Sequence, residues 1–346
     1  MRSAMLQAAG LLAGCTGALA PAPVERTPPV AVMPAPPRHD PADGRLADNA
    51  ACERCHSVIA AEWRSSQHRS SFLDPEFARA FARERTPFCR TCHAPEAALA
   101  GAVTVAAAEV GVGCVTCHTP HDGGPAVLAR SASGRAEHAV RASAAFVDVG
   151  GCASCHEFDF AARRGLPMQL TVTEHAQSAF ATTGCSECHM PEVGDGAARH
   201  RSHVFSASRD PEMLRRAVEI DVERLDDATV RIRLAPGEIG HAFPTGDLFR
   251  RVLVEAEGFD EDGDPIAYDA RPLERRFAHP RDGAGRRVPT LVRDDRVGAP
   301  ALHGDGGVVD VTLDLGAGAD TLEVRWRIVH QRVEFPTFDD EAVIAG

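Results

Sequence analysis

Ten of the eleven cysteines fall into five pairs of identical spacing, and a histidine directly follows each pair. The five motifs are Cys52-Glu-Arg-Cys55-His56, Cys89-Arg-Thr-Cys92-His93, Cys114-Val-Thr-Cys117-His118, Cys152-Ala-Ser-Cys155-His156 and Cys185-Ser-Glu-Cys188-His189. The pattern C-x-x-C-H is typical of covalent attachment of c-type haem. Two thiols at this spacing can add to the two vinyl groups of one porphyrin, and the adjoining histidine then binds the iron as its proximal ligand.

Zinc binding and redox-active thiols explain the same motifs less well. Zinc ribbons use paired C-x-x-C knuckles, but they do not require a histidine after each pair. Redox C-x-x-C motifs occur singly, near a thioredoxin-like βαβ pattern. Neither accounts for five repeats that use every cysteine except Cys15. We therefore expect five covalently bound haems c.

The spacing of the motifs predicts how the haems are arranged. All five motifs lie within residues 52–189, which is too short a stretch to build five separate globular pockets. The haems must therefore share walls and lie close together. Close haems exchange electrons quickly, so the spacing favours an electron relay.

Histidines outside the motifs are candidates for the second axial position of each iron, which helps to set the haem potential. His68 lies in a predicted helix after the first motif, and we favour ligation over a solvated helix histidine. His175 lies in a weak internal repeat of that segment, with Glu174 aligned to Glu62. His175 is either a ligand or a structural residue.

Five more residues offer alternatives that the sequence leaves open. His200 and His203 follow the fifth motif, and we favour His203. His121 and His138 follow the third motif, and we favour His138 because His121 is only three residues from His118. Met168 could supply a thioether, which would raise the potential of its haem.

The first 45 residues are predicted to form an export signal followed by a tether. Residues 1–20 are typical of an export signal and are too short to span a bilayer. Leu12-Ala13-Gly14-Cys15 resembles a bacterial lipobox, which implies cleavage before Cys15 and acylation of its thiol. The alternative is cleavage after Ala20. Residues 21–45 are proline-rich and should be extended. We expect a lipid-anchored protein in the periplasm or at the cell surface.

The composition of the chain limits the classes of partner that it can bind. A net charge of -12 argues against nucleic acid, because a phosphate-binding protein presents a basic face. The charge suits complementary surfaces on redox partner proteins. Aromatic residues make up only 5% of the chain. A core so poor in large side chains needs another source of apolar bulk, and porphyrins would supply it.

A different pattern begins after the last motif. Apolar and polar residues alternate with period two, which predicts half-buried strands. The alternating segments are 217–223, 229–234, 252–257, 308–315 and 322–328. We predict an α plus irregular pentahaem domain over residues 46–212, followed by an all-β, immunoglobulin-like sandwich over residues 213–346.

The sequence also resembles the multihaem cytochromes c related to the tetrahaem cytochrome and octahaem hydroxylamine oxidoreductase group. The resemblance rests on the tandem motifs, Trp63-x-x-Ser66-x-His68, Cys188-His189-Met190-Pro191, Ser202-His203-x-Phe205 and Gly240-His241-Ala-Phe243-Pro244-Thr245-Gly246. The last segment is similar to a GHxFPTG signature, and this similarity implies that His241 caps a haem. Arg250 and Arg251 follow it and either pair with haem propionates or form surface salt bridges. The single tyrosine, Tyr268, lies outside the haem region, which weakens the expectation that this protein oxidises hydroxylamine.

Three functions compete at this point. An electron carrier, which we favour, has six ligands on every iron and no catalytic residues. An oxidoreductase acting on a small nitrogen or sulfur compound has one haem with an open axial site. A binding module has haems that are only structural.

Overall fold

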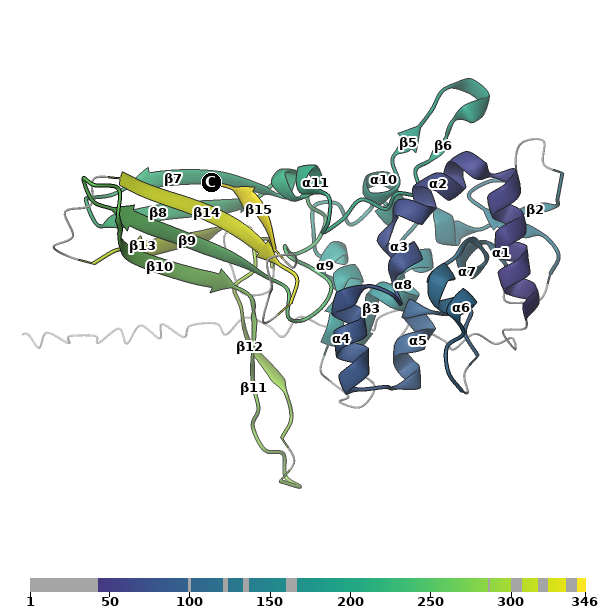
Figure 1. The fold of residues 1–346 in the computed structure, drawn as a ribbon, viewed down its shortest axis with the longest axis horizontal. Helices are drawn as coiled ribbons and strands as arrows, with labels where there is room; N and C mark the ends of the chain where they lie inside the picture. The colour runs from purple at the N-terminus through teal and green to yellow at the C-terminus, as the bar shows by residue number, and fades with distance from the viewer. Residues whose placement is uncertain are drawn as a thin grey trace, which may run out of the picture.

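The computed structural model describes residues 43–98, 101–120, 124–132, 137–159, 167–285, 287–299, 307–316, 323–333 and 341–346. Two regions follow each other along the chain, a helical region and then a β region (Figure 1). Cys15, the export signal, His121 and most of the predicted tether lie outside the described residues. Among the described residues, no helix is both long and apolar enough to cross a membrane.

The helical region is built from short helices joined by turns and two-stranded ladders. Its helices are α1 (Asp43–Cys55), α2 (Ser57–Ser65), α3 (Gln67–Ser70), α4 (Pro75–Arg83), α5 (Pro87–His93), α6 (Val105–Val110), α7 (Cys114–His118), η1 (Ala144–Phe146), α8 (Gly150–His156), α9 (Thr171–Ala176), α10 (Cys185–His189) and η2 (Gly196–Ala198). Its strands are β1 (Val127–Ala129), β2 (Val140–Ala142), β3 (Glu157–Asp159), β4 (Pro167–Leu170), β5 (Glu192–Val193) and β6 (His200–Arg201). They pair as β1–β2, β3–β4 and β5–β6.

This region has almost no apolar core of its own. The buried apolar side chains among described residues 43–210 are Ala60, Trp63, Ala94, Ala97, Ala107, Ala108, Val115 and Ala153. Alanine buries too little surface to offset the loss of chain entropy on folding. The region therefore needs further apolar bulk between its helices, in agreement with the low aromatic content.

The β region contains two antiparallel sheets. One has the order β13 (Val309–Asp314), β8 (Thr229–Pro236), β7 (Val218–Arg224). The other has the order β10 (Pro265–Leu273), β9 (Arg251–Phe259), β14 (Glu323–Gln331), β15 (Glu341–Ala345). The sheets share one apolar core, to which Val230, Ile232 and Leu234 of the first sheet and Val252 and Val254 of the second belong.

The period-two pattern predicted the five strands β7, β8, β9, β13 and β14; β7, β8, β13 and β14 expose every second residue over part of their length, whereas β9 alternates between buried and partly buried residues. It missed β10 and β15, and also a hairpin of β11 (Arg275–Ala278) and β12 (Thr290–Asp294) that extends away from the two sheets (Figure 1). Helix α11 (Pro211–Arg216) begins just before the predicted boundary at residue 213, and its Leu214 packs into the β core.

A buried ion network joins the two regions. Arg296 is 1% exposed and donates to Glu174 of α9 at 2.7 Å and to Asp294 at 2.6 Å. The second oxygen of Glu174 accepts a bond of 2.6 Å from the hydroxyl of Thr245. A further contact joins Arg332 to Glu76 of α4. Burial of ionised groups is favourable only when partners replace water, and here they do.

Replacement of Glu174 by alanine should therefore destabilise the protein, because it leaves part of the Arg296 charge unpaired. We expect a loss of about 3 kcal/mol, the low end for a broken buried pair, since Asp294 still binds Arg296. Denaturant unfolding of the haem-loaded protein measures this loss.

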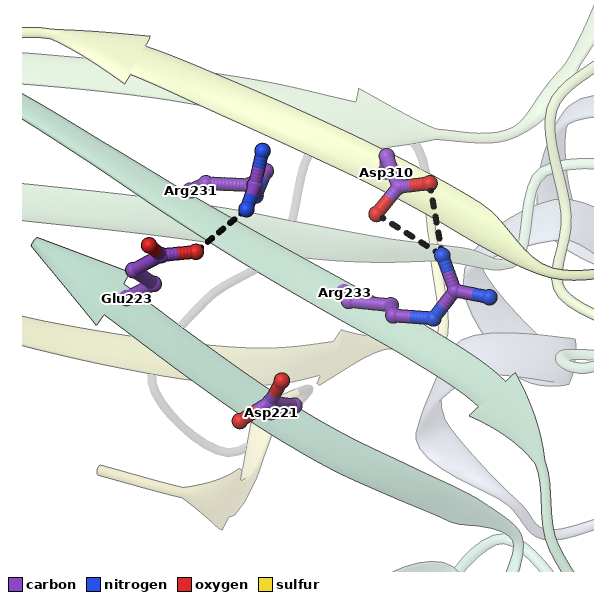
Figure 2. Close-up of a pocket in the computed structure, with 5 residues that line it drawn as sticks. All are labelled: Asp221, Glu223, Arg231, Arg233 and Asp310. Atoms are coloured by element: carbon purple, nitrogen blue, oxygen red, sulfur yellow. Dashed lines mark hydrogen bonds and ion pairs between the residues drawn. The ribbon is translucent and has the colours of Figure 1, made fainter. Parts of the chain in front are cut away.

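The matched control is Asp310→Ala. Asp310 pairs with Arg233 on the solvent face of the first sheet, beside the pair of Glu223 and Arg231 (Figure 2). Both side chains of the Asp310 pair are about half exposed, so we expect a change of less than about 1 kcal/mol. Equal effects of the two substitutions would contradict a stabilising role for the buried network.

Candidate functional site

Four of the motifs lie on one turn of helix, on α5, α7, α8 and α10, and the first lies on the last turn of α1 with His56 directly after the helix end. Residues three and four apart on a helix share a face. The two cysteines and the histidine of a motif therefore project to the same side, as attachment to one planar group requires. The helix starts favour this local structure, since Thr86 caps α5 and Pro87 occupies its first turn.

Hydrogen bonds to the backbone fix the orientation of three motif histidines. The Nδ1 atoms of His93, His118 and His189 lie 2.8, 2.7 and 2.8 Å from backbone carbonyl oxygens. A carbonyl can only accept, so Nδ1 carries the proton in each ring. Nε2 is then the unprotonated nitrogen, which is the usual arrangement of a metal-binding histidine.

Four motif histidines each face a histidine from a distant part of the chain. The pairs and their ring-centre distances are His56 and His138 at 6.3 Å, His156 and His68 at 6.3 Å, His118 and His203 at 6.3 Å, and His189 and His241 at 6.2 Å. An imidazole nitrogen binds a transition metal at about 2 Å and lies about 1 Å from its ring centre, so two imidazoles on opposite sides of one metal have centres about 6 Å apart. The four pairs fit this requirement.

The structure distinguishes His203 from His200 as a candidate ligand. The Nδ1 of His203 lies 2.8 Å from the carbonyl oxygen of Arg201, which leaves Nε2 free. His200 uses both nitrogens, one with the carbonyl of Ala198 and the other with Glu62 at 3.1 Å. Glu62 also accepts a bond of 2.9 Å from the backbone N–H of His203. Glu62 therefore holds the segment that carries His203, a role the sequence analysis did not detect.

The remaining motif histidine has a different surrounding. His93 stacks on Phe77 of α4, with ring centres 3.7 Å apart and an angle of 12° between the planes. Phe72 and Phe81 pack beside Phe77. Within the described part of the chain, no histidine lies opposite His93 at the spacing of the four pairs.

Removal from water favours the neutral form of His68 and of His156. Removal from water, followed by the charge of neighbouring histidines, lowers the pKa of His68 to about 3 and that of His156 to about 4. Both rings are therefore unprotonated at neutral pH and can donate a lone pair to a metal. An aromatic side chain separates two of these sites, because Phe205 packs against both His68 and His203.

Contacts between cysteines of different motifs show that the motifs are neighbours. The thiols of Cys52 and Cys114, of Cys92 and Cys155, and of Cys152 and Cys185 lie within hydrogen-bonding reach of each other. Burial raises the pKa of the Cys117 thiol, and the charge of the nearby Cys155 raises it further. The motifs therefore connect in the order first, third, fourth and fifth, and the second joins at the fourth.

The segment 240–246 connects the β region to these sites. His241 pairs with His189, the carbonyl oxygen of Pro244 accepts from Arg296 at 2.9 Å, and Thr245 donates to Glu174. Glycine relieves crowding at Gly240 and backbone strain at Gly246. A Cβ at Gly240 would lie 3.2 Å from the His175 ring, and Gly246 has φ +90°, with Arg250 2.6 Å from where its Cβ would be.

Other sequence candidates lie elsewhere. His175 is buried beside Gly240 and contributes to the lowered pKa of His241, and it does not pair with a motif histidine through any described ring contact. Met168 lies on β4. His138 lies opposite the first motif and not the third, which it follows in sequence. Arg251 forms surface contacts with Gln331 and Glu274, whereas Arg250 donates to the carbonyl of Thr245.

Comparisons with known proteins agree with these observations. Residues 51–119, which contain the first three motifs, match the family described as cytochrome c554 and c-prime. The fold is similar to that of a penta-heme cytochrome c552 from Thermochromatium tepidum, with a TM-score of 0.65, 18% identity, and coverage of 87% of this chain and 97% of that chain. No curated protein matches. These findings support a multihaem c-type cytochrome with covalently bound haem c.

The histidine pairs predict distinct effects of two neighbouring substitutions. His203→Ala removes the imidazole opposite His118, so one ferric haem should change from low spin to high spin. His200→Ala, the matched control, removes a ring whose nitrogens are already engaged and should leave the spin states unchanged. Electron paramagnetic resonance of the oxidised proteins measures both. A new high-spin signal in the His200 variant alone would reverse the assignment.

Proposed function

We propose that this chain is an exported pentahaem cytochrome c that transfers electrons between redox partner proteins. Each motif binds one haem through its two thiols and its histidine. The haem supplies reversible one-electron chemistry when bound. The four histidine pairs carry the proposal, because a spacing of 6.2–6.3 Å that recurs four times matches imidazoles that share a metal.

In this proposal, particular histidines fill the axial positions of the haem irons. The proximal ligands are His56, His93, His118, His156 and His189. The distal ligands opposite the first, third, fourth and fifth of these are His138, His203, His68 and His241. Backbone carbonyls keep the rings in the tautomer that presents Nε2 to the metal.

The contacts between thiols support transfer from haem to haem. Each cysteine bonds to the edge of its own porphyrin, so two thiols in contact bring two porphyrin edges together. Electrons would pass along the first, third, fourth and fifth haems, with the second as a branch at the fourth. Ligand sets that do not change with oxidation state would need little rearrangement.

The location and the anchor form part of the proposal. We infer that residues 1–20 direct export, that Cys15 carries a lipid and that residues 21–45 space the haem region from the membrane. The lipobox-like sequence and the proline content support this inference. The net charge of -12 suits complementary surfaces on redox partners, which electrostatic attraction would bring together quickly.

Two finer assignments are also proposed. The sheet orders β7–β8–β13 and β10–β9–β14–β15 support an immunoglobulin-like sandwich, because such folds divide their strands between two sheets in a comparable way. A relation to the hydroxylamine oxidoreductase group is supported by the segment 240–246, in which His241 faces His189.

Intact mass and redox titration test the main proposal together. We expect the mature protein to carry the mass of five haems, to begin at an acylated Cys15, and to take up five electrons reversibly. A mass with no haem, or zinc in place of iron, would exclude a cytochrome. Five haems on a chain with an unmodified N-terminus would contradict only the proposed lipid anchor. Five haems without reversible reduction would favour a binding module.

A second function is favoured by the surroundings of His93, which lacks an opposing histidine among the described residues. The haem of the second motif would then bind and transform a small nitrogen or sulfur compound at an open axial position. We expect the oxidised protein to show one high-spin ferric signal that changes when nitrite or hydroxylamine is added. Five low-spin signals, unaltered by either compound, would leave electron transfer as the only function.

A further inference from the structure

Unpaired nitrogen atoms of the β region gather next to the segment 240–246. Arg275 is 5% exposed, and neither its Nε nor its Nη1 has a hydrogen-bond partner. The Nε of Arg250 and the Nδ1 of His330 are also buried without partners, and His330 is 1% exposed. A buried donor left unpaired costs about 1–3 kcal/mol, and more when it is charged. Such a group of donors indicates that something else accepts from them.

Two consecutive backbone carbonyls each bind one of the two guanidinium groups. Arg250 donates through Nη1 to the carbonyl oxygen of Thr245 at 3.2 Å, and Arg275 donates through Nη2 to that of Gly246 at 2.9 Å. Consecutive carbonyls thus fix one nitrogen of each arginine and leave the unpaired ones available. Gly246 makes this arrangement possible, since any side chain there would meet Arg250.

The carboxylates of the protein near this site are already engaged. Both oxygens of Glu174 are used, one by Arg296 and one by Thr245. Asp294 binds Arg296 through both of its oxygens. Asp247 accepts from the backbone N–H of Phe249. Among the described residues, no carboxylate is hydrogen-bonded to the Nε of Arg250 or to the Nε and Nη1 of Arg275.

We propose that Arg275 and Arg250 bind the propionate carboxylates of the haem attached to the fourth motif. A guanidinium group is well suited to a carboxylate, because it offers several N–H donors and remains charged when buried. The fourth motif lies next to this part of the β region, because Glu157, which follows His156, accepts from the N–H groups of Val172 and Thr173 of α9, and Glu174 of the same helix binds Arg296. The inference rests on the proposed attachment of haem at this motif.

The contact gives the β region influence over one haem. A propionate next to an iron opposes the arrival of an electron, and a paired guanidinium offsets that negative charge. Loss of the arginine therefore makes the haem harder to reduce and lowers its midpoint potential. Loss of the hydrogen bonds also alters the vibration of the propionate, which resonance Raman spectroscopy detects independently of charge.

The test compares three variants of the haem-loaded protein in buffer free of oxyanions. Arg275→Met should lower the midpoint potential of one haem and shift one propionate band. Arg275→Lys keeps the charge with fewer donors, so it should shift the band and largely preserve the potential; this variant also serves if the methionine protein does not fold. Arg276→Met is the matched control on the same strand, because Arg276 is half exposed and lies 3.6 Å from Glu274 and Asp295.

The outcomes separate the propionate contact from the wider proposal. If the mass shows five haems and Arg275→Met behaves like Arg276→Met, the contact is excluded and the cytochrome stands. If the wild-type band and potential change when nitrite or phosphate is added, and the change disappears in Arg275→Met, the donors bind a free oxyanion and the propionate assignment fails. Absence of haem at the fourth motif would refute both.

Discussion

The spacing between paired imidazole rings is the constraint on which the rest of the structure depends. A distance of 6.2–6.3 Å that recurs in four pairs suits one atom placed between two ring nitrogens. Four distant segments must be positioned to keep it, yet the helical region buries little apolar surface beyond Trp63 and a few alanines. The bound groups would therefore act both as redox centres and as most of the core, and the proposed function and the fold depend on the same contacts.

The sequence predicted what is local and missed what is not. The five C-x-x-C-H motifs could be found from spacing alone, because each is a local pattern, whereas haem attachment at them stays a prediction. The strands with clear alternation were predicted for the same reason. The histidine partners depend on how the helices pack, and here nearness in sequence misleads: His68 follows the first motif but faces His156 of the fourth. Likewise, the sequence did not show that Arg296 binds Glu174 or that Arg275 donates to the carbonyl oxygen of Gly246.

The segment 240–246 shows why one short sequence can serve two regions. His241 reaches a motif histidine, Thr245 reaches α9, and the carbonyls of Pro244 and Gly246 accept from Arg296 and Arg275. A loop tied down at so many points cannot shift without breaking buried hydrogen bonds, each of which is costly to leave unmade. The β region is therefore a fixed wall of the candidate haem site, and a substitution in its interior can act on the haem region through this loop.

The fourth motif occupies the central position in this arrangement. Its cysteines lie near those of the second, third and fifth motifs, and the residue after its histidine, Glu157, accepts from the N–H groups of Val172 and Thr173 at the start of α9. The same short helix carries Glu174, which binds Arg296. The junction of the proposed electron route and the boundary between the two regions are thus parts of one buried unit. In a relay that branches, the potential at the junction decides how electrons divide, so a cation placed there has more effect than one at either end. The buried arginines of the β region lie beside this junction.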